Sequence, residues 1–445
     1  MNARRAILLA GAGGAFGSLD TALNIAFPDL ASSFDVEVAD LQWVVISFVL
    51  SYGGLLLAAG QLGDRIGHRR MLMGGAAGSM VAMVLCAVAP SFGWFLGARV
   101  LQGITTAMVM AAAPALAIRA AGSEHRGRAA GVFQMSAGIG GAVGPIVGGP
   151  LVELGGWPAV FWFRVPVAFA LFGLALTVRE DAATPTAKAD VVGAIVTSIV
   201  LAGALLTLNS GGTFGWTSPV VLMLVFATLA LGTAHVRRSL RHPDPIVDLR
   251  LFRIPAFATA NFLTVAANGS MFVAWLLVPT LVVVEMGSST FVGGLVLAAS
   301  PLAMALTSPH AGRWADRSGA AKPVAVGVAL EAVGLVVLGF ATAAWSPIWV
   351  GVALAIVGVG LGLFGAPNMA QVMGALPTDQ QGVAGGLTLM MRTSGIVVGV
   401  AASGALFGAL EPSRGFGSAF HFTVGASAIA AAGAALVSLT SLRRD

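Results

Sequence analysis

Long apolar runs, separated by short polar loops, recur from one end of this chain to the other. We count fourteen of them, each near the roughly 20 residues with which a helix crosses the hydrocarbon layer of a membrane. The runs lie at about 6–27, 40–61, 71–90, 93–117, 128–151, 159–178, 191–209, 217–236, 256–283, 290–311, 323–343, 346–369, 383–409 and 418–440. Backbone in lipid must satisfy its own hydrogen bonds, and continuous runs of this length are typical of helices rather than of barrel strands. The sequence therefore predicts an all-α polytopic membrane protein with 14 transmembrane helices.

The composition excludes several classes of protein. Of the 445 residues, 57% are hydrophobic and 10% are charged, against roughly 45–50% and about 25% in soluble domains. A single cysteine, Cys86, excludes an internal disulfide framework, and the six histidines form no pair at metal-ligand spacing. The glycine-rich stretch 11–17 has Phe16 where a dinucleotide fingerprint needs glycine, and the chain has no Walker A sequence. We therefore expect neither an enzyme nor a metal or cofactor, and no direct use of ATP.

Basic residues are distributed unevenly between the loops. With the N-terminus inside, the inner loops hold 20 of the 24 Lys and Arg residues, and the outer loops hold only Arg414. Cytoplasmic loops carry such an excess, so both termini are expected in the cytoplasm and the chain in the cytoplasmic membrane. The same bias explains the net charge of +5 more simply than nucleic-acid binding does. The first run contains Asp20 and is interpreted as a retained span rather than a cleaved signal.

Two similar turns indicate an internal repeat. Stretches 60–67 and 312–319 both read Gly-x-x-x-Asp-Arg-x-Gly between apolar runs, 252 residues apart (312 − 60). This offset predicts two six-helix bundles, 1–180 and 255–445, joined by a two-helix region at 181–254, an arrangement typical of transporters with a substrate site between two halves. Small residues in the fifth run form a ridge for close helix packing. They are Gly138, Gly141, Gly144, Pro145 and Gly148.

Three ionisable residues inside apolar runs are the candidates for proton transfer. Asp20, Arg99 and Glu331 would each be costly in hydrocarbon unless paired or hydrated. Arg99 is expected to pair with Asp20 or with a backbone carbonyl. The alternative for Asp20 is a plain hydrogen bond to a neighbouring helix. Glu331 is equally well interpreted as a proton site, a contact for a cationic substrate, or a structural hydrogen bond.

Polar and aromatic side chains at helical spacing are candidates for a substrate pocket. Residues 261, 264, 268, 272 and 275 share one face of the ninth run, which corresponds to the first run in the repeat. A cavity for amphiphilic molecules combines apolar and aromatic walls with a few polar groups. The candidates are Asn24, Gln134, Asn261, Thr264, Asn268, Phe272, Trp275 and Asn368. Hydrogen bonding between helices is the alternative for the polar members.

Several motifs together resemble a known family. They are Leu19–Pro28, Gly60–Arg70, Arg99–Gly103, Gly138–Gly149, Trp157–Pro166 and His242–Arg253. In this order they resemble the fourteen-span drug:proton antiporters of the major facilitator superfamily, in which the Arg99 motif is associated with proton transfer. The chain departs from that family at Arg164, where relatives often have asparagine, and we interpret this as a difference in the outer loop.

The resemblance implies a proton-coupled efflux antiporter that works by alternating access. Its expected cargo is an amphiphilic drug or toxic compound, and the carboxylates favour a cationic cargo only weakly. Its other expected partners are protons and the lipid bilayer, with no nucleic acid, no cofactor beyond the proton gradient, and a monomeric state. Two alternatives stay open: a dedicated exporter of one metabolite or antibiotic, and a transporter-like sensor that binds ligand without turnover.

The repeated turns are expected to act as a conformational gate. Asp64 lies where the N-terminus of the thirteenth run, near Gly382, should also emerge, and a helix N-terminus attracts a carboxylate. The first turn is predicted to be the principal gate and the second its weaker partner. The gate residues are Gly60, Asp64, Arg65, Gly67, Asp316 and Arg317.

Overall fold

The computed structural model describes residues 3–178, 190–215, 217–242, 245, 249–375 and 381–441. Within these ranges the chain is built from helices and contains no strand, so the predicted all-α class is confirmed. Ten stretches of the described chain are long and apolar enough to cross a membrane. The count of fourteen spans stays a prediction.

The first helical segment of the chain is broken into three consecutive parts. Helix α1 is followed without a gap by a 3₁₀ segment, η1, and then by the short helix α2. Proline at the second position of α2 is tolerated because the first turn of a helix lacks intrahelical N–H partners. A mid-helix stretch of 3₁₀ structure often marks a functional hinge. The bounds are α1 (Ala3–Ser18), η1 (Leu19–Ala26) and α2 (Phe27–Phe34).

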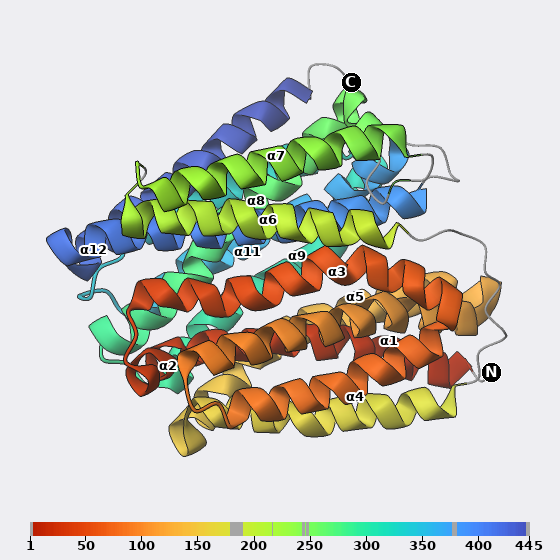
Figure 1. Ribbon diagram of the computed structural model, residues 1–445, viewed down its shortest axis with the longest axis horizontal. Helices are drawn as coiled ribbons and strands as arrows, with labels where there is room; N and C mark the ends of the chain where they lie inside the picture. Colours follow the sequence, from red (N-terminus) through yellow and green to blue (C-terminus); the bar gives the residue numbers. More distant parts are fainter. Residues whose placement is uncertain are drawn as a thin grey trace.

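Helices α3, α4 and α5 complete the first group. Gly67, with φ of 98°, separates α3 from α4 in a conformation that residues with a side chain rarely adopt. Helix α5 has 86 residues and would be about 130 Å long if straight. It instead folds back on itself, with one reversal at Gly156, where φ is +65° (Figure 1). The bounds are η2 (Val38–Leu41), α3 (Gln42–Ile66), α4 (His68–Ala87) and α5 (Phe92–Thr177).

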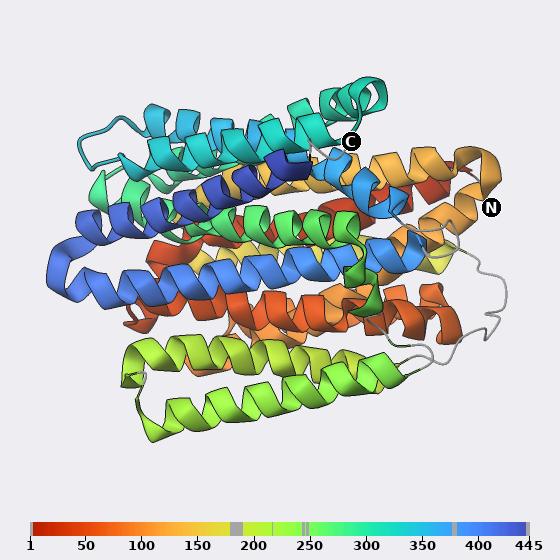
Figure 2. The same cartoon turned by 90° about the horizontal axis from the view of Figure 1, so that it is seen from above.

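Helices α6 (Val191–Phe214) and α7 (Pro219–Arg241) form a hairpin along one side of the molecule (Figure 2). Helix α6 contacts α3 and α12, whereas α7 is largely exposed. Asp190 caps α6 by accepting from the N–H of Gly193 at 2.9 Å, and it pairs with Arg238 of α7 at 2.6 Å. Apolar side chains such as Phe226, 76% exposed, are what a lipid-facing helix requires.

The remaining helices form a second group that packs beside the first (Figure 1). Helix α12 contains two helices that meet at Gly415, where φ is 75°. The boundaries predicted at residues 180 and 254 stay predictions, and the first of them lies outside the described residues. The bounds are η3 (Leu249–Arg253), α8 (Pro255–Thr280), the π-helical η4 (Leu281–Glu285), α9 (Thr290–Ser318), α10 (Ala321–Gly339), α11 (Pro347–Gly374) and α12 (Gln381–Ser441).

Glycines bring the two groups into close contact along α5 and α9. A Cβ atom placed on Gly149 would lie 2.7 Å from the Cα of Phe291, and one on Gly294 would overlap the carbonyl oxygen of Pro145. Glu153 accepts hydrogen bonds from the N–H of Phe291 and from the Thr290 hydroxyl, each at 3.0 Å. We call this region, residues 149–153 against 290–294, the Glu153 contact. Through these two bonds, Glu153 of α5 caps the start of α9.

The predicted glycine ridge of α5 faces two neighbours. Gly144 and Gly148 approach the backbone of η1 so closely that a Cβ would meet Thr21 or Ala22. Gly138 and Gly141 lie opposite α9 at ordinary contact distance from Ala305 and Pro301, and the carbonyl of Pro145 faces Gly294 of α9. Close helix approach through small residues is the packing that membrane helices favour.

Candidate functional site

Asp20 lies at the centre of a network of charged and polar side chains. It sits on η1, and its side chain is 14% exposed. Arg99 donates to both carboxylate oxygens, from Nη1 to Oδ1 at 2.8 Å and from Nη2 to Oδ2 at 2.9 Å. Gln102 Nε2 donates to Oδ1 at 3.1 Å, and Arg164 Nη1 donates to the same oxygen at 2.6 Å. We call these four residues the Asp20 cluster.

Arg99 is held on several sides. Its Nε donates to the carbonyl of Val44 at 3.2 Å, and its Nη1 donates to Gln102 Oε1 at 2.7 Å. The guanidinium carbon lies 4.3 Å from the centre of the Phe48 ring, within the range of a cation–π contact. The sequence predicted Asp20 or a backbone carbonyl as the partner of Arg99, and the structure confirms both contacts. The role of Arg99 in proton coupling stays a prediction.

Arg164 corrects the sequence interpretation. It was assigned to a difference in the outer loop, but its side chain is 2% exposed and reaches Asp20 inside the first group. The reversal of α5 at Gly156 returns the chain so that residues 99 and 164 of one helix face the same carboxylate. A signal was present in the sequence: an arginine within an apolar run needs an anionic partner. Nothing in the sequence alone tells which partner it meets.

Glu331 has a different environment. It lies on α10 in the second group, is 0% exposed, and neither carboxyl oxygen has a hydrogen-bond partner among the described residues. The α10 backbone at Glu331 lies so close to Gly360 of α11 that a Cβ there would stand 2.5 Å from the Glu331 nitrogen. An unpaired buried charge is strongly unfavourable. The two predicted carboxyl groups therefore lie in different halves with opposite surroundings, one paired twice and one unpaired.

The polar face predicted for residues 261–268 is buried on α8. Thr264 and Asn268 donate to carbonyls of their own helix at 2.9 and 2.8 Å, as does Asn261 at 2.9 Å. Asn368 of α11 donates to Thr264 Oγ1 at 2.8 Å, and Arg392 of α12 donates to Asn268 Oδ1 at 3.2 Å. These are the bonds between helices that the structural alternative requires. A role in substrate binding stays a prediction.

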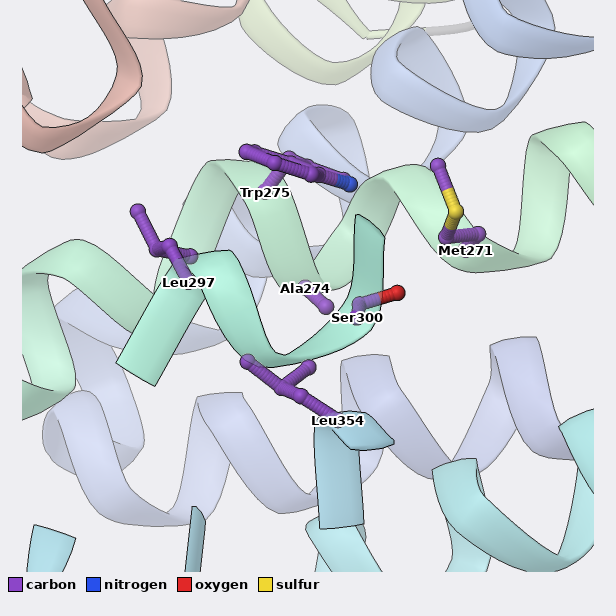
Figure 3. Close-up of a pocket in the computed structure, with 6 residues that line it drawn as sticks. All are labelled: Met271, Ala274, Trp275, Leu297, Ser300 and Leu354. Atoms are coloured by element: carbon purple, nitrogen blue, oxygen red, sulfur yellow. The ribbon is translucent and has the colours of Figure 1, made fainter. Parts of the chain in front are cut away.

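Trp275, one of the two aromatic candidates, lines a recess in the second group. Figure 3 shows Trp275 and Met271 of α8 beside Leu297 and Ser300 of α9, with Leu354 of α11 across from them. The recess leaves no room even for a water-sized molecule, whereas usual ligand pockets have volumes of roughly 300–1,000 Å³. This recess is too small for a drug-sized molecule in the conformation described.

The other pocket candidates are scattered. Asn24 is buried on η1, four residues after Asp20, and Phe272 is half-buried. The side chain of Gln134 lies outside the described residues. The structure thus brings Asn261, Thr264, Asn268 and Asn368 together and leaves Asn24 in the first group.

The gate turns are described only in part. Gly67 and Gly319 have φ values of 98° and 80°, which explains the last glycine of each pattern. The side chains of Asp64, Arg65 and Asp316 lie outside the described residues, Gly60 is half-buried, and Arg317 is exposed.

Arg69, which follows the first turn, bonds the end of α5. Its Nε donates to the carbonyl of Ala175 at 3.1 Å, and its Nη2 donates to that of Leu176 at 3.2 Å. Cations stabilise the carbonyl end of a helix. The end of the first turn is therefore attached to the last pass of α5.

Comparison with known proteins now assigns the family. Residues 9–400 match the model of the Major Facilitator Superfamily. The chain belongs to the major facilitator superfamily. Its membership confirms a multi-pass membrane transporter, and the finer fourteen-span antiporter assignment stays a prediction.

Relatives within the superfamily carry several names. The chain is 30% identical over 398 residues to the multidrug resistance protein Stp of Mycobacterium tuberculosis, covering 88% of this chain and 74% of that one. It is 27% identical over 388 residues to the riboflavin transporter RibZ of Clostridioides difficile, with 86% and 84% covered. It is 25% identical over 389 residues to the methylenomycin A resistance protein of Bacillus subtilis, with 87% and 83% covered.

Solved structures of two other transporters share the fold. A point mutant of the nucleoside transporter NupG superposes with a TM-score of 0.71 at 11% identity, covering 98% of this chain and 99% of that one. The POT family transporter PepTSo superposes with the same TM-score at 16% identity, with 100% and 99% covered. At these identities the likeness is one of fold alone.

Proposed function

We propose that this protein is a proton-coupled antiporter that exports amphiphilic small molecules by alternating access. The observation that carries the proposal is the Asp20 cluster: a partly exposed carboxylate on a 3₁₀ break, held by arginines. Ionisable groups at such depth mark proton or ion pathways. The relatives named for multidrug and antibiotic resistance support an exporter.

The cluster offers a route from proton binding to movement. Arg99 and Arg164 hold Asp20 most strongly while the carboxylate is charged, because each bond is then also an attraction between opposite charges. A proton on Asp20 weakens these bonds and releases η1, which contacts α8 and α9 of the second group. Proton binding in one half thereby alters the contact between halves, as alternating access requires.

A pH gradient across proteoliposomes tests this proposal. Purified protein is reconstituted, and the uptake or release of amphiphilic dyes is followed with the gradient imposed in either direction and with none. Gradient-dependent transport is expected. Substrate movement that is indifferent to the gradient would refute proton coupling.

A dedicated exporter of one compound is the second candidate. It is favoured by the relatives named for single compounds, riboflavin and methylenomycin A. A substrate panel in the same vesicles separates the two: transport of one compound supports the dedicated exporter, and transport of many supports the broader one. Binding without any transport would support a sensor instead.

Glu331 is proposed as a second proton site. Glu331→Gln keeps the shape of the side chain and cannot ionise, so the melting temperature should stay within a few degrees of wild type, while transport loses its response to the pH gradient. Both are measured on the same reconstituted protein. A variant that weakens binding of a cationic dye but keeps the gradient response would instead make Glu331 a substrate contact, and unaltered behaviour in both would leave it structural.

The Glu153 contact is proposed to close one side of the transport path. Gly149→Ala places a methyl group against Phe291, so the contact should open and the conformational equilibrium should shift toward the state in which α5 and α9 are apart. Spin labels on cysteines at Leu154 and Ser289 report the change as a longer distance. Gly97→Ala, also on α5 but with no atom within 4 Å of the added Cβ, is the matched control. An unchanged distance in Gly149→Ala would contradict the assignment.

A further inference from the structure

The Asp20 cluster carries more positive than negative charge. Two guanidinium groups face one carboxylate, which leaves a net charge of +1 in a buried place. Among the described residues, Asp20 is the one acidic partner of either arginine, and Gln102 is neutral. Buried charges in membrane proteins are normally paired. The cluster is therefore short of one negative charge.

The missing anionic partner is one for Arg164. Its Nη1 bonds Asp20, but Nε and Nη2 are buried and have no hydrogen-bond partner among the described residues. Arg99, by contrast, uses all three nitrogens. Nε and Nη2 form one edge of the planar guanidinium, and paired donors of this kind match the two oxygens of a carboxylate or phosphate. The unfilled edge is thus a donor pair suited to an anion.

The cluster lies beside the second half of the molecule. Asp20 is 14% exposed, and η1, which carries it, contacts α8 and α9. Movement of the two halves apart would uncover the side of η1 that contacts α8 and α9. A ligand between the halves could then reach the Arg164 edge.

We propose that the Nε–Nη2 edge of Arg164 binds the acidic group of the transported molecule, which is an amphiphilic carboxylate rather than a cation. The inference rests on the proposed function, because it names the substrate class of that site. It departs from the weak expectation of a cationic cargo. An inorganic anion such as chloride offers the same chemistry, so the experiment must distinguish the two.

Two dyes with one scaffold and opposite charge provide the test. Binding of fluorescein, an anion, and rhodamine 123, a cation, is measured on the purified full chain by quenching of its tryptophan fluorescence, which does not depend on a proton gradient. Wild type should prefer fluorescein. In Arg164→Asn, the ratio of the fluorescein to the rhodamine 123 affinity should fall by roughly tenfold to hundredfold, the loss expected for hydrogen bonds to a charged group.

Control variants keep the test interpretable. Arg164→Lys retains the charge but not the paired donors and should restore part of the preference. Arg237→Asn removes the same charge from the exposed end of α7 and should leave the ratio at the wild-type value. Thermal unfolding of each variant shows whether it folds. If Arg164→Asn does not fold, the wild-type preference and the Arg164→Lys ratio decide the question.

Three results would overturn the inference: preference of wild type for rhodamine 123, binding of neither dye, or an Arg164→Asn ratio equal to that of wild type. A further experiment replaces chloride by gluconate in the buffer and compares dye binding with and without chloride. If chloride binding depends on Arg164 but fluorescein binding does not, the edge holds an inorganic anion and the substrate assignment is wrong. Failure of the pH-gradient experiment would refute proton coupling and leave these binding results standing, so the two failures are distinguishable.

Discussion

Arg99→Ala is expected to abolish gradient-driven transport while the protein still reaches the membrane. The change removes both bonds to Asp20, the bond to Val44 and the contact with Phe48. Asp20 keeps one arginine, so its charge remains compensated and the chain should fold. Truncating one partner of a buried charged pair typically costs about 2–5 kcal/mol. A rise of about 2.7 kcal/mol in the activation free energy of transport lowers the transport rate roughly hundredfold. Transport in vesicles with an imposed pH gradient measures this.

Arg99→Lys is the informative companion. Lysine keeps the charge but cannot reach both carboxylate oxygens with a planar fork. Intermediate transport is therefore expected, between wild type and Arg99→Ala. Surface labelling of intact cells verifies expression of both. Near-normal coupled transport by Arg99→Ala would remove Arg99 from the proposed mechanism.

Asp20→Asn should have the largest effect on stability. It leaves Arg99 and Arg164 facing one another with no anion, and an uncompensated buried charge typically costs about 3–5 kcal/mol. A clear fall in the melting temperature of the purified protein is expected. Any transport that remains should ignore the pH gradient, because asparagine cannot carry the proton.

A double variant separates charge repulsion from general damage. Asp20→Asn combined with Arg164→Asn removes one positive charge and should recover part of the lost stability, so the two changes are not additive. A double variant that melts lower than either single variant would contradict the charge balance described for the cluster. The single Arg164→Asn variant, which leaves Asp20 paired with Arg99, completes the double-mutant cycle.

Much of the fold was predictable because, in a membrane, the hydrophobicity of a short stretch of sequence determines its secondary structure. Apolar runs near 20 residues must become helices, since lipid offers no partner for unpaired backbone. The two repeated turns were recognised from their pattern, and Gly67 and Gly319, which end them, have the positive φ values that sharp breaks between helices need. The domain boundaries and the count of spans are finer than these signals and stay predictions.

The candidate site was predictable in part. Asp20 and Arg99 stood out because ionisable groups in hydrocarbon are costly, and each is the natural partner of the other. Arg164 was misplaced because hydropathy locates a residue along its own helix and gives no information about its neighbours. Asn261, Thr264 and Asn268 were recognised as one helix face, but periodicity alone could not tell that they bond the backbone and adjacent helices.

The sequence by itself determined that this protein is helical, lies in a membrane and places a carboxylate and an arginine within its spans. Only the tertiary structure decided that a second arginine, from a later pass of α5, meets the same carboxylate. It also decided that Glu331 has no partner among the described residues. The physical reason is the distance along the chain over which each interaction acts. Helix formation in lipid depends on neighbouring residues. The charge balance of the Asp20 cluster instead depends on residues that lie 79 and 144 positions from Asp20.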